Sequence, residues 1–173
     1  MLANLYARLG RNAEAHERVI QLVDHDDHKV FDRRSEYWLL NMALLGDACV
    51  SVGDEARARV IYERAADVTN VNVVVGTAGI DGSFDRVLGR LAGLLSRWED
   101  AEKHFATGRA REQHLKSPAL VARTDVHHAE MLLRANRSGD LVRADELLSA
   151  AVATANGLGM RNLQRDIDHI RDR

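Results

Sequence analysis

A helix-pair pattern that recurs every 43 residues constrains this chain more than any other feature. In its clearest copy, Leu45-Gly46 is followed by Cys49, Gly53, Ala58, Tyr62 and Ala65. Leu45 and Cys49 lie one helical turn apart, so they share one face of a helix. Gly53 can end that helix in a left-handed conformation, and Asp54 can cap the next one. The unit therefore predicts two antiparallel helices joined by a short turn.

The same pattern appears before and after this copy. The earlier copy contains Leu2-Ala3, Tyr6, Gly10, Ala15, Val19 and Leu22, and the later copy contains Leu88-Gly89, Ala92, Ser96, Ala101, Phe105 and Gly108. A fourth copy contains Gly139-Asp140, Ala144, Leu148 and Ala151. There we prefer a register slipped by four residues, with Met131 matching Ala92 and a longer turn from Asn136 to Asp140. Because glycine inside a helix is costly relative to alanine, Gly46 predicts a neighbouring helix that leaves no room for a side chain.

These copies predict an all-α protein, a right-handed α-α superhelix of four helix pairs in which each pair packs against its neighbours. We expect repeats at about 1–27, 33–69, 76–114 and 119–156, followed by a capping helix at 160–170. Because Leu2 already occupies a core position of a first helix, we expect a single domain that is the C-terminal fragment of a larger protein. The alternative is a short protein that self-associates through this N-terminal end.

The spacing of small and large apolar residues resembles the tetratricopeptide repeat, whose usual length is about 34 residues. The longer unit here looks like a variant of that repeat with extended helices. A second resemblance is carried by residues 72–76 (NVVVG), 88–92 (LGRLA), 97–105 (RWEDAEKHF), 122–124 (ART), 129–133 (AEMLL) and 157–160 (GLGM). These stretches are similar to the C-terminal repeat region of large bacterial ATPase regulators of the MalT/LuxR type, some of which carry a class III nucleotide cyclase at the other end.

The resemblance covers most of residues 35–160 and implies a function. It implies a non-catalytic scaffold for protein–protein interaction or signal relay, as the regulatory repeat part of a bacterial transcriptional or signalling regulator. ATP binding, DNA binding or cyclase activity would then lie on other segments. The alternative is a small-molecule effector sensor, because MalT-like repeat regions can enclose an effector. In either case we expect no catalytic residue and no cofactor in this chain.

Charge and hydropathy argue against several other classes of protein. The chain has 24 basic and 26 acidic residues and a net charge of −2, which gives no basic field for nucleic acid or an anionic membrane. No apolar run approaches the roughly 18 residues of a membrane-spanning helix. Cys49 is the sole cysteine, so no disulfide framework is possible. We therefore expect a cytoplasmic protein whose partner is a protein or peptide.

A polar row on the first helices is the candidate partner site. First helices of such repeats line a concave groove, and the residue two positions after each leucine should face it. These residues are Asn4, Asp47 and Arg90, with Arg8 in an adjacent column. A polar row beside small apolar residues can bind a peptide or a partner helix. The alternative is that Asp47 and Arg90 pair with each other across neighbouring repeats.

Residues 24–28 (DHDDH) are the candidate metal site. His25 and His28 can share one helix face with Asp27, and two histidines with a carboxylate can bind zinc or iron. This set would support a third hypothesis, a metal-assisted hydrolase. We prefer the alternative that these side chains are solvated or capping groups at a helix end, so we expect no metal.

Three further features point to chemistry only at first sight. Residues 73–83 (VVVGTAGIDGS) combine a β-branched run with a glycine-rich turn, as a phosphate-binding loop does. The spacing of the glycines does not match that of such loops, and the sequence has no other strand-like run to form a parallel sheet. We therefore expect a helix start or an ordered connector. Adjacent residues on a helix point about 100° apart, so His127 and His128 do not converge on one ion, and we expect one packed and one exposed. Cys49 occupies a core position, as a small buried apolar residue does.

Overall fold

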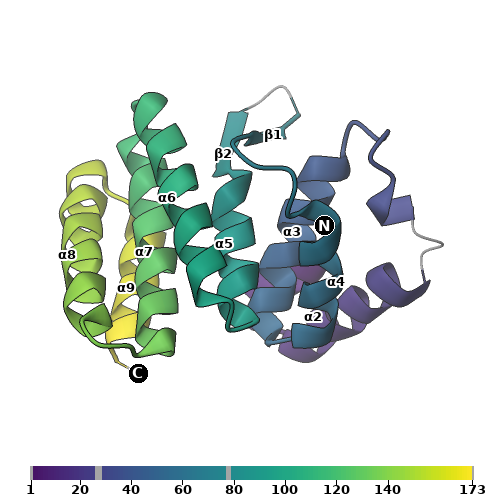
Figure 1. Cartoon of the computed structure of the whole chain (residues 1–173), viewed down its shortest axis with the longest axis horizontal. Helices are drawn as coiled ribbons and strands as arrows, with labels where there is room; N and C mark the ends of the chain where they lie inside the picture. Colours follow the sequence, from purple (N-terminus) through teal and green to yellow (C-terminus); the bar gives the residue numbers. More distant parts are fainter. Residues whose placement is uncertain (1, 26–28, 77–78, 173) are drawn as a thin grey trace.

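The computed structural model describes residues 2–25, 29–76 and 79–172 and is built almost entirely of helices (Figure 1). The helices are α1 (Leu2–Arg8), α2 (Asn12–Ile20), α3 (Trp38–Val52), α4 (Glu55–Ala65), α5 (Phe84–Leu94), α6 (Trp98–His114), α7 (Pro118–Ala135), α8 (Asp140–Leu158) and α9 (Arg161–Arg171). A π-helical turn (Gln21–His25) extends α2, and a short 3-10 turn (Lys29–Phe31) precedes α3. Over the described residues, the prediction of a mostly helical chain is confirmed.

Helix ends lie where the turn chemistry predicts them. Gly53 ends α3 with φ of 71°, a left-handed conformation that glycine adopts without strain. The side chain of Asp54 then accepts a hydrogen bond from the backbone N–H of Arg57 at 3.1 Å and caps α4. Pro118 begins α7, where its missing N–H costs nothing. The predicted longer turn between α7 and α8 is confirmed, because α7 ends at Ala135 and α8 begins at Asp140.

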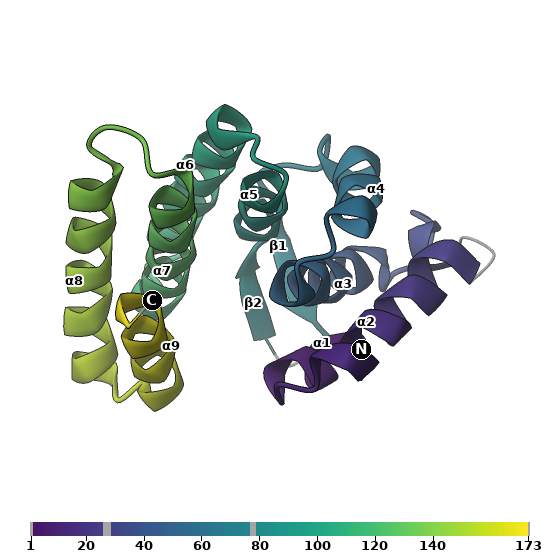
Figure 2. The same ribbon diagram turned by 90° about the horizontal axis from the view of Figure 1, so that it is seen from below.

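The first helices of the pairs lie side by side. Contacts join α1 to α3, α3 to α5 and α5 to α7, while each second helix packs beside its own first helix. In Figure 2 this row, with α1 at one end and α7 at the other, is curved, and α9 lies on one side of it. We call this side of α1, α3, α5 and α7, which carries Asn4, Asp47, Arg90 and His127, the inner face.

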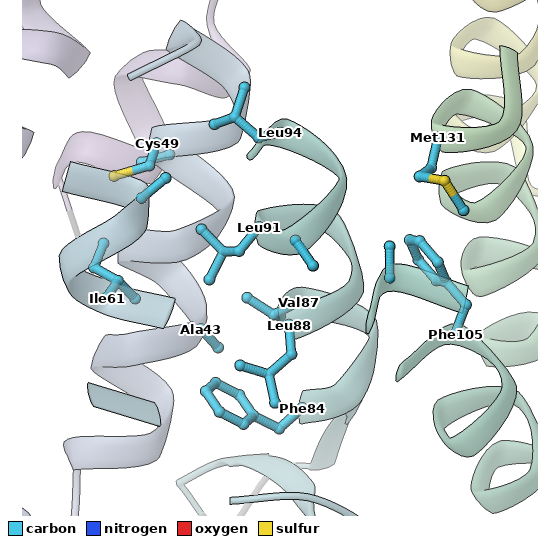
Figure 3. Packing of buried hydrophobic residues seen from close by; sticks show 14 of the residues in the cluster. Ala43, Cys49, Ile61, Phe84, Val87, Leu88, Leu91, Leu94, Phe105 and Met131 are labelled. Carbon is cyan, nitrogen blue, oxygen red and sulfur yellow. The ribbon is translucent and has the colours of Figure 1, made fainter. Parts of the chain in front are cut away.

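Small residues set how closely the helices approach, as the sequence predicts. A Cβ atom on Gly46 would lie 2.8 Å from Cγ1 of Val87, so α3 and α5 are in contact at this point. A Cβ atom on Gly89 would lie 3.0 Å from the ring of Phe105 in α6. Figure 3 shows the apolar side chains that fill the space on both sides of α5. Cys49 is fully buried within this core, which confirms its predicted packing role.

A β-hairpin interrupts the helices, and here the sequence-based prediction is wrong. Residues expected to form a helix start or connector with a single strand-like run form β1 (Asn72–Val75) and β2 (Gly79–Ser83), paired antiparallel. The second strand was missed because glycine and aspartate are depleted in strands. The register of the hairpin shifts between Val73 and Val74 of β1. Val73 pairs with Gly82 and Val74 pairs with Ile80, so Asp81 of β2 is a bulge residue with no partner in β1. Two members of the glycine-rich stretch, 77 and 78, lie outside the described residues.

The helices of the second repeat cover less of the chain than expected. The repeat expected over 33–69 is α-helical only from Trp38 to Val52 and from Glu55 to Ala65. Separately, none of the helices in the described residues is both long and apolar enough to cross a membrane.

Candidate functional site

The structure brings two of the four predicted groove residues together and places the other two apart. Asp47 and Arg90 form an ion pair between α3 and α5. Asn4 is half-buried, and its Nδ2 donates to the carbonyl oxygen of Leu44 at 3.4 Å, which ties α1 to α3. Arg8 is exposed at the end of α1. The 43-residue spacing therefore describes contacts between successive first helices.

Asp47 is less exposed than the sequence predicts. Its side chain is 16% exposed, and that of Arg90 is 13% exposed. One carboxylate oxygen accepts from Arg90, and the other lies 3.8 Å from Nη1 of Arg86. Burial alone would raise the pKa of Asp47, but the two guanidinium groups outweigh it and lower the pKa below its usual value. Asp47 is therefore an ionised link between two arginines, and little of its side chain is left open to the groove that the sequence predicts.

A second carboxylate, Asp81, comes from the hairpin. Oδ2 of Asp81 accepts from Nη2 of Arg86 at 3.1 Å. Nη1 of Arg123 in α7 donates both to the backbone oxygen of Asp81, at 3.0 Å, and to its Oδ1, at 3.3 Å. The bulge thus turns Asp81 toward α5 and α7, and Arg123 fixes it there. Arg86, at the centre, is only 1% exposed.

His127 faces the same group of charges. Burial, together with the positive charges of Arg90, Arg86 and Arg123, lowers the pKa of His127 well below 6.5, so its ring is neutral at pH 7. Its Nδ1 is buried and has no hydrogen-bond partner among the described residues. We refer to Asp47, Asp81, Arg86, Arg90, Arg123 and His127 together as the arginine cluster.

The neighbouring histidine has a different environment. The ring of His128 stacks on Phe105, with centroids 5.0 Å apart, and its Nε2 lies 2.9 Å from Oε2 of Glu102. The two adjacent histidines therefore face different helices, which confirms that they do not converge. The expectation that one of them is exposed is wrong, since both are at least partly buried.

Glu112 of α6 lies beneath the cluster. Its Oε1 accepts from the backbone N–H of Ser83 at 2.9 Å, which holds the end of β2. Burial raises the pKa of Glu112, while the Ser83 hydrogen bond and nearby positive charges oppose that shift. Its role in the structure is to anchor the hairpin from the protein interior.

The predicted metal residues give no metal centre in the described part of the chain. His25 ends the π-helical turn, whereas Asp27 and His28 lie outside the described residues. No group of three or more His, Cys, Asp or Glu side chains in the described ranges is placed to hold a metal ion. Cys49 is not poised for chemistry either, because burial strongly raises the pKa of its thiol.

A pocket lies on the other side of the molecule, between α4 and α6. Its volume is about 470 Å³, and Tyr62, His104 and Asp85 are among its lining residues. The Tyr62 hydroxyl lies 3.1 Å from Nε2 of His104, and Nδ1 of His104 lies 3.2 Å from Oδ1 of Asp85. Asp85 is fully buried, and the guanidinium of Arg97 lies over the Tyr62 ring at 4.7 Å from its centroid. Burial raises the pKa of Tyr62, so this chain of contacts holds a neutral phenol.

Sequence reasoning missed most of the arginine cluster, although a signal for it exists. Arg86 precedes Arg90 by one helical turn on α5, and Arg123 precedes His127 by one turn on α7. Two such pairs on consecutive first helices indicate a shared polar stripe. Asp81 had no comparable signal, because its position depends on the hairpin. The prediction that Asp47 and Arg90 can pair across repeats is confirmed.

No protein-family model, curated protein or solved structure matches this chain.

Proposed function

We propose that this chain is a non-catalytic scaffold for protein–protein interaction or signal relay. In this proposal its helix pairs form a right-handed tetratricopeptide-like superhelix. It would serve as the regulatory repeat part of a bacterial regulator of the MalT/LuxR type and act in the cytoplasm. The supporting observation is the side-by-side packing of α1, α3, α5 and α7, which makes one continuous inner face from four helix pairs.

The inner face is suited to partner recognition because its polar groups stand on rigid helices. Hydrogen bonds and ion pairs from Asn4 to Leu44 and from Arg90 to Asp47 fix neighbouring helices relative to each other. Side chains on a fixed backbone lose less conformational freedom on binding than side chains on loops. Exposed Arg8 and Ser51 lie in one column of this face and are available to a protein or peptide partner.

Self-association through the N-terminal end is a second form of the same proposal. Leu2, Leu5 and Leu9 are exposed, and their spacing places them on one side of α1 and the turn after it. Light scattering of the wild-type protein and of Leu5→Glu tests it. A dimer that dissociates in the variant supports self-association, and a wild-type monomer at all accessible concentrations contradicts it.

Site-specific photo-crosslinking in the native host tests partner binding. A photoreactive amino acid replaces Arg8 or Ser51 on the inner face, and Arg59, an exposed residue of α4, is the matched control. We expect the two inner-face positions to label the same protein and position 59 not to label it. That protein, once identified by mass spectrometry and purified, should bind the wild-type chain more tightly than Arg90→Ala. Equal labelling from all three positions, or unchanged binding by Arg90→Ala, contradicts the proposal.

A small-molecule effector sensor is the second candidate, and the pocket between α4 and α6 favours it. Polar groups such as His104 and Thr107 line a volume of about 470 Å³, which lies in the range of small-ligand sites. The test is a thermal shift with a metabolite panel on the wild type and on Thr107→Met, which fills the pocket. A compound that raises the Tm of the wild type only supports the sensor. If no compound acts, or if both proteins respond equally, the pocket is not an effector site.

A metal-assisted hydrolase stays the third hypothesis. Metal analysis of the purified protein, with and without His25→Ala, tests it. Stoichiometric zinc or iron that is lost in the variant would support a site at residues 24–28, and its absence from the wild type would contradict one.

A further inference from the structure

The arginine cluster brings together more positive than negative groups. Within the described residues, Arg86, Arg90 and Arg123 share the two carboxylates of Asp47 and Asp81. Each carboxylate bridges two arginines, and Arg86 takes part in both bridges. The three guanidinium groups are close enough that Arg123 and Arg90 each oppose the positive charge on Arg86.

Glu112 and Asp166 are further acidic groups near the cluster, but neither forms one of its ion pairs. Glu112 approaches from α6, and its Oε1 accepts a hydrogen bond from the backbone N–H of Ser83. Asp166 of α9 is exposed, and its nearest opposing charges include Arg165 and Arg8 as well as Arg90. Partial burial raises the pKa of Asp166, and the negative charge of Glu130 of α7, which lies nearby, also opposes its ionisation. The ion pairs of the cluster therefore join three guanidinium groups to only two carboxylates.

Several polar atoms of the cluster are not used in the described structure. Nε of Arg86, Nε of Arg90 and Nδ1 of His127 are buried and have no hydrogen-bond partner there. Buried polar groups in folded proteins are nearly always paired, so groups that are not paired with protein atoms point to a further partner. Two of these atoms, Nε of Arg90 on α5 and Nδ1 of His127 on α7, belong to side chains that are only partly buried, and they indicate a partner that binds between the two helices.

The side chains of the cluster differ in their exposure to solvent. The side chains of Arg123 and Asp81 are both 33% exposed, that of Arg90 is 13% exposed, and that of Arg86 is 1% exposed. A group that arrives from solvent thus meets Arg123, Arg90 and His127 before it meets Arg86. Arg86 lies underneath and contributes its charge through the two aspartates and through space.

We propose that Arg90, Arg123 and His127 form a subsite on the inner face for a carboxylate group. A carboxylate supplies the single negative charge that these ion pairs lack, and its planar shape matches the guanidinium fork. A phosphate dianion would bring two negative charges to ion pairs that lack one. The carboxylate belongs either to an acidic side chain of the protein partner or to a small organic acid. This inference rests on the proposed role of the inner face in binding.

The ring signals of His127 report binding directly. The probes are sodium acetate and a short glutamate-rich peptide, each titrated at constant ionic strength against sodium chloride while the His127 resonances are followed by NMR. We expect saturable shifts with at least one of the two probes. A bound carboxylate offsets the nearby arginines, so it should also raise the pKa of His127. A response to the peptide alone assigns the carboxylate to a protein segment, and a response to acetate as well assigns the site to any organic acid.

Matched variants separate a site from a general charge effect. Arg123→Gln should weaken binding about tenfold, the loss expected for one charge-assisted hydrogen bond. Arg59→Gln removes the same charge from the exposed side of α4 and should leave binding unchanged. If Arg123→Gln does not fold, Arg123→Lys keeps the charge, loses the fork and should still weaken binding.

Several results would overturn the inference. These are the absence of saturable shifts beyond those of chloride, equal binding by the Arg123 and Arg59 variants, and tighter binding of inorganic phosphate than of either carboxylate. The result is separable from the crosslinking experiment. If the chain crosslinks to a partner but binds no carboxylate, the subsite is contradicted and the scaffold proposal stands. If the chain binds a carboxylate but crosslinks to no partner, the scaffold proposal is contradicted and the subsite stands as a site for an organic acid.

Discussion

Arg90 of α5 donates a hydrogen bond to Asp47 of α3, the residue one repeat earlier in the sequence. Each of the two side chains is less than one-fifth exposed. The pair joins consecutive first helices at the inner face, beside the close approach at Gly46. A position that the sequence pattern marks as available to a partner is thus also part of what holds two repeats together.

Replacing Asp47 with Asn should lower the free energy of unfolding by about 2–4 kcal/mol, because it leaves buried Arg86 and largely buried Arg90 without the carboxylate that they share. Urea unfolding at pH 7 measures the change. Asp67→Asn is the matched control, since Asp67 pairs with Arg33 at the surface with side chains 63% and 49% exposed. That variant should lose less than about 1 kcal/mol. Equal losses would show that the inner pair is no stronger than a surface pair.

Gly46→Ala should destabilise the protein by about 1–2 kcal/mol despite the better helix propensity of alanine. The new Cβ would lie 2.8 Å from Cγ1 of Val87, whose branched side chain has little freedom to move. Gly157→Ala in α8 is the control, because its Cβ would meet nothing within 4 Å. That variant should gain about 0.5–1 kcal/mol. Thermal unfolding compares the two, and a stabilised Gly46→Ala would contradict the close helix contact.

The repeat pattern predicted the helices well because it records short-range rules that operate within one turn. Gly53, Asp54 and Pro118 determine helix ends through their own backbone and side-chain chemistry, so their neighbours in sequence are sufficient. Gly46 could be interpreted without a structure because glycine in a helix interior needs a reason. The hairpin was missed because the pairing of β2 depends on long-range anchors, such as the contact of Glu112 with Ser83.

The candidate site was predictable only in part. The spacing placed Asp47 and Arg90 on one face and allowed their pairing, but it could not show that Arg86 would be buried between them. The contribution of Asp81 depends on a bulge whose position no local pattern specifies. Helical periodicity thus predicts which residues share a face, whereas burial and pairing on that face depend on the segments packed against it.

Cys49 should react very slowly with thiol reagents in the folded protein. It is fully buried, and burial raises the pKa of its thiol, so the reactive thiolate is scarce. Reaction with a disulfide reagent should become fast in denaturant, at a concentration that matches unfolding measured by circular dichroism. A native reaction rate like that of a small free thiol would contradict the buried position.

His127 should make stability depend on pH below neutrality. Its folded-state pKa lies well below 6.5, so just below pH 6.5 the unfolded chain binds a proton that the folded chain does not. Stability therefore falls as the pH drops, by up to about 1.4 kcal/mol per pH unit for this group.

Urea unfolding at pH 7.5 and 5.5 should show this loss in the wild type and a smaller loss in His127→Gln. Burial also lowers the pKa of His128, so part of the loss should remain. His114→Gln, an exposed change in α6, is the control and should keep the wild-type dependence. An unchanged pH dependence in His127→Gln would show that its ring is not held neutral.

Glu102 should contribute stability that acid removes. Its carboxylate accepts hydrogen bonds from Arg143 and Arg137, and it lies 2.9 Å from Nε2 of His128, so it joins α6, α7, α8 and the turn before α8. The hydrogen bond from Arg143 outweighs burial and lowers the pKa of Glu102 from 4.5 to about 2. The folded carboxyl therefore stays ionised where the unfolded one is protonated, so its contribution is complete above about pH 4.5 and disappears as the pH falls toward 2.

Glu102→Gln should accordingly lower the free energy of unfolding at pH 7 by roughly 1–3 kcal/mol. The difference between the variant and the wild type should shrink between pH 4.5 and pH 2.5, because the wild-type carboxyl then loses its advantage. Urea unfolding across this range measures it. Glu146→Gln, an exposed substitution on α8, should change little at any pH. A Glu102→Gln deficit that stays constant down to pH 2.5 would mean that packing of the side chain, and not its charge, holds these helices together.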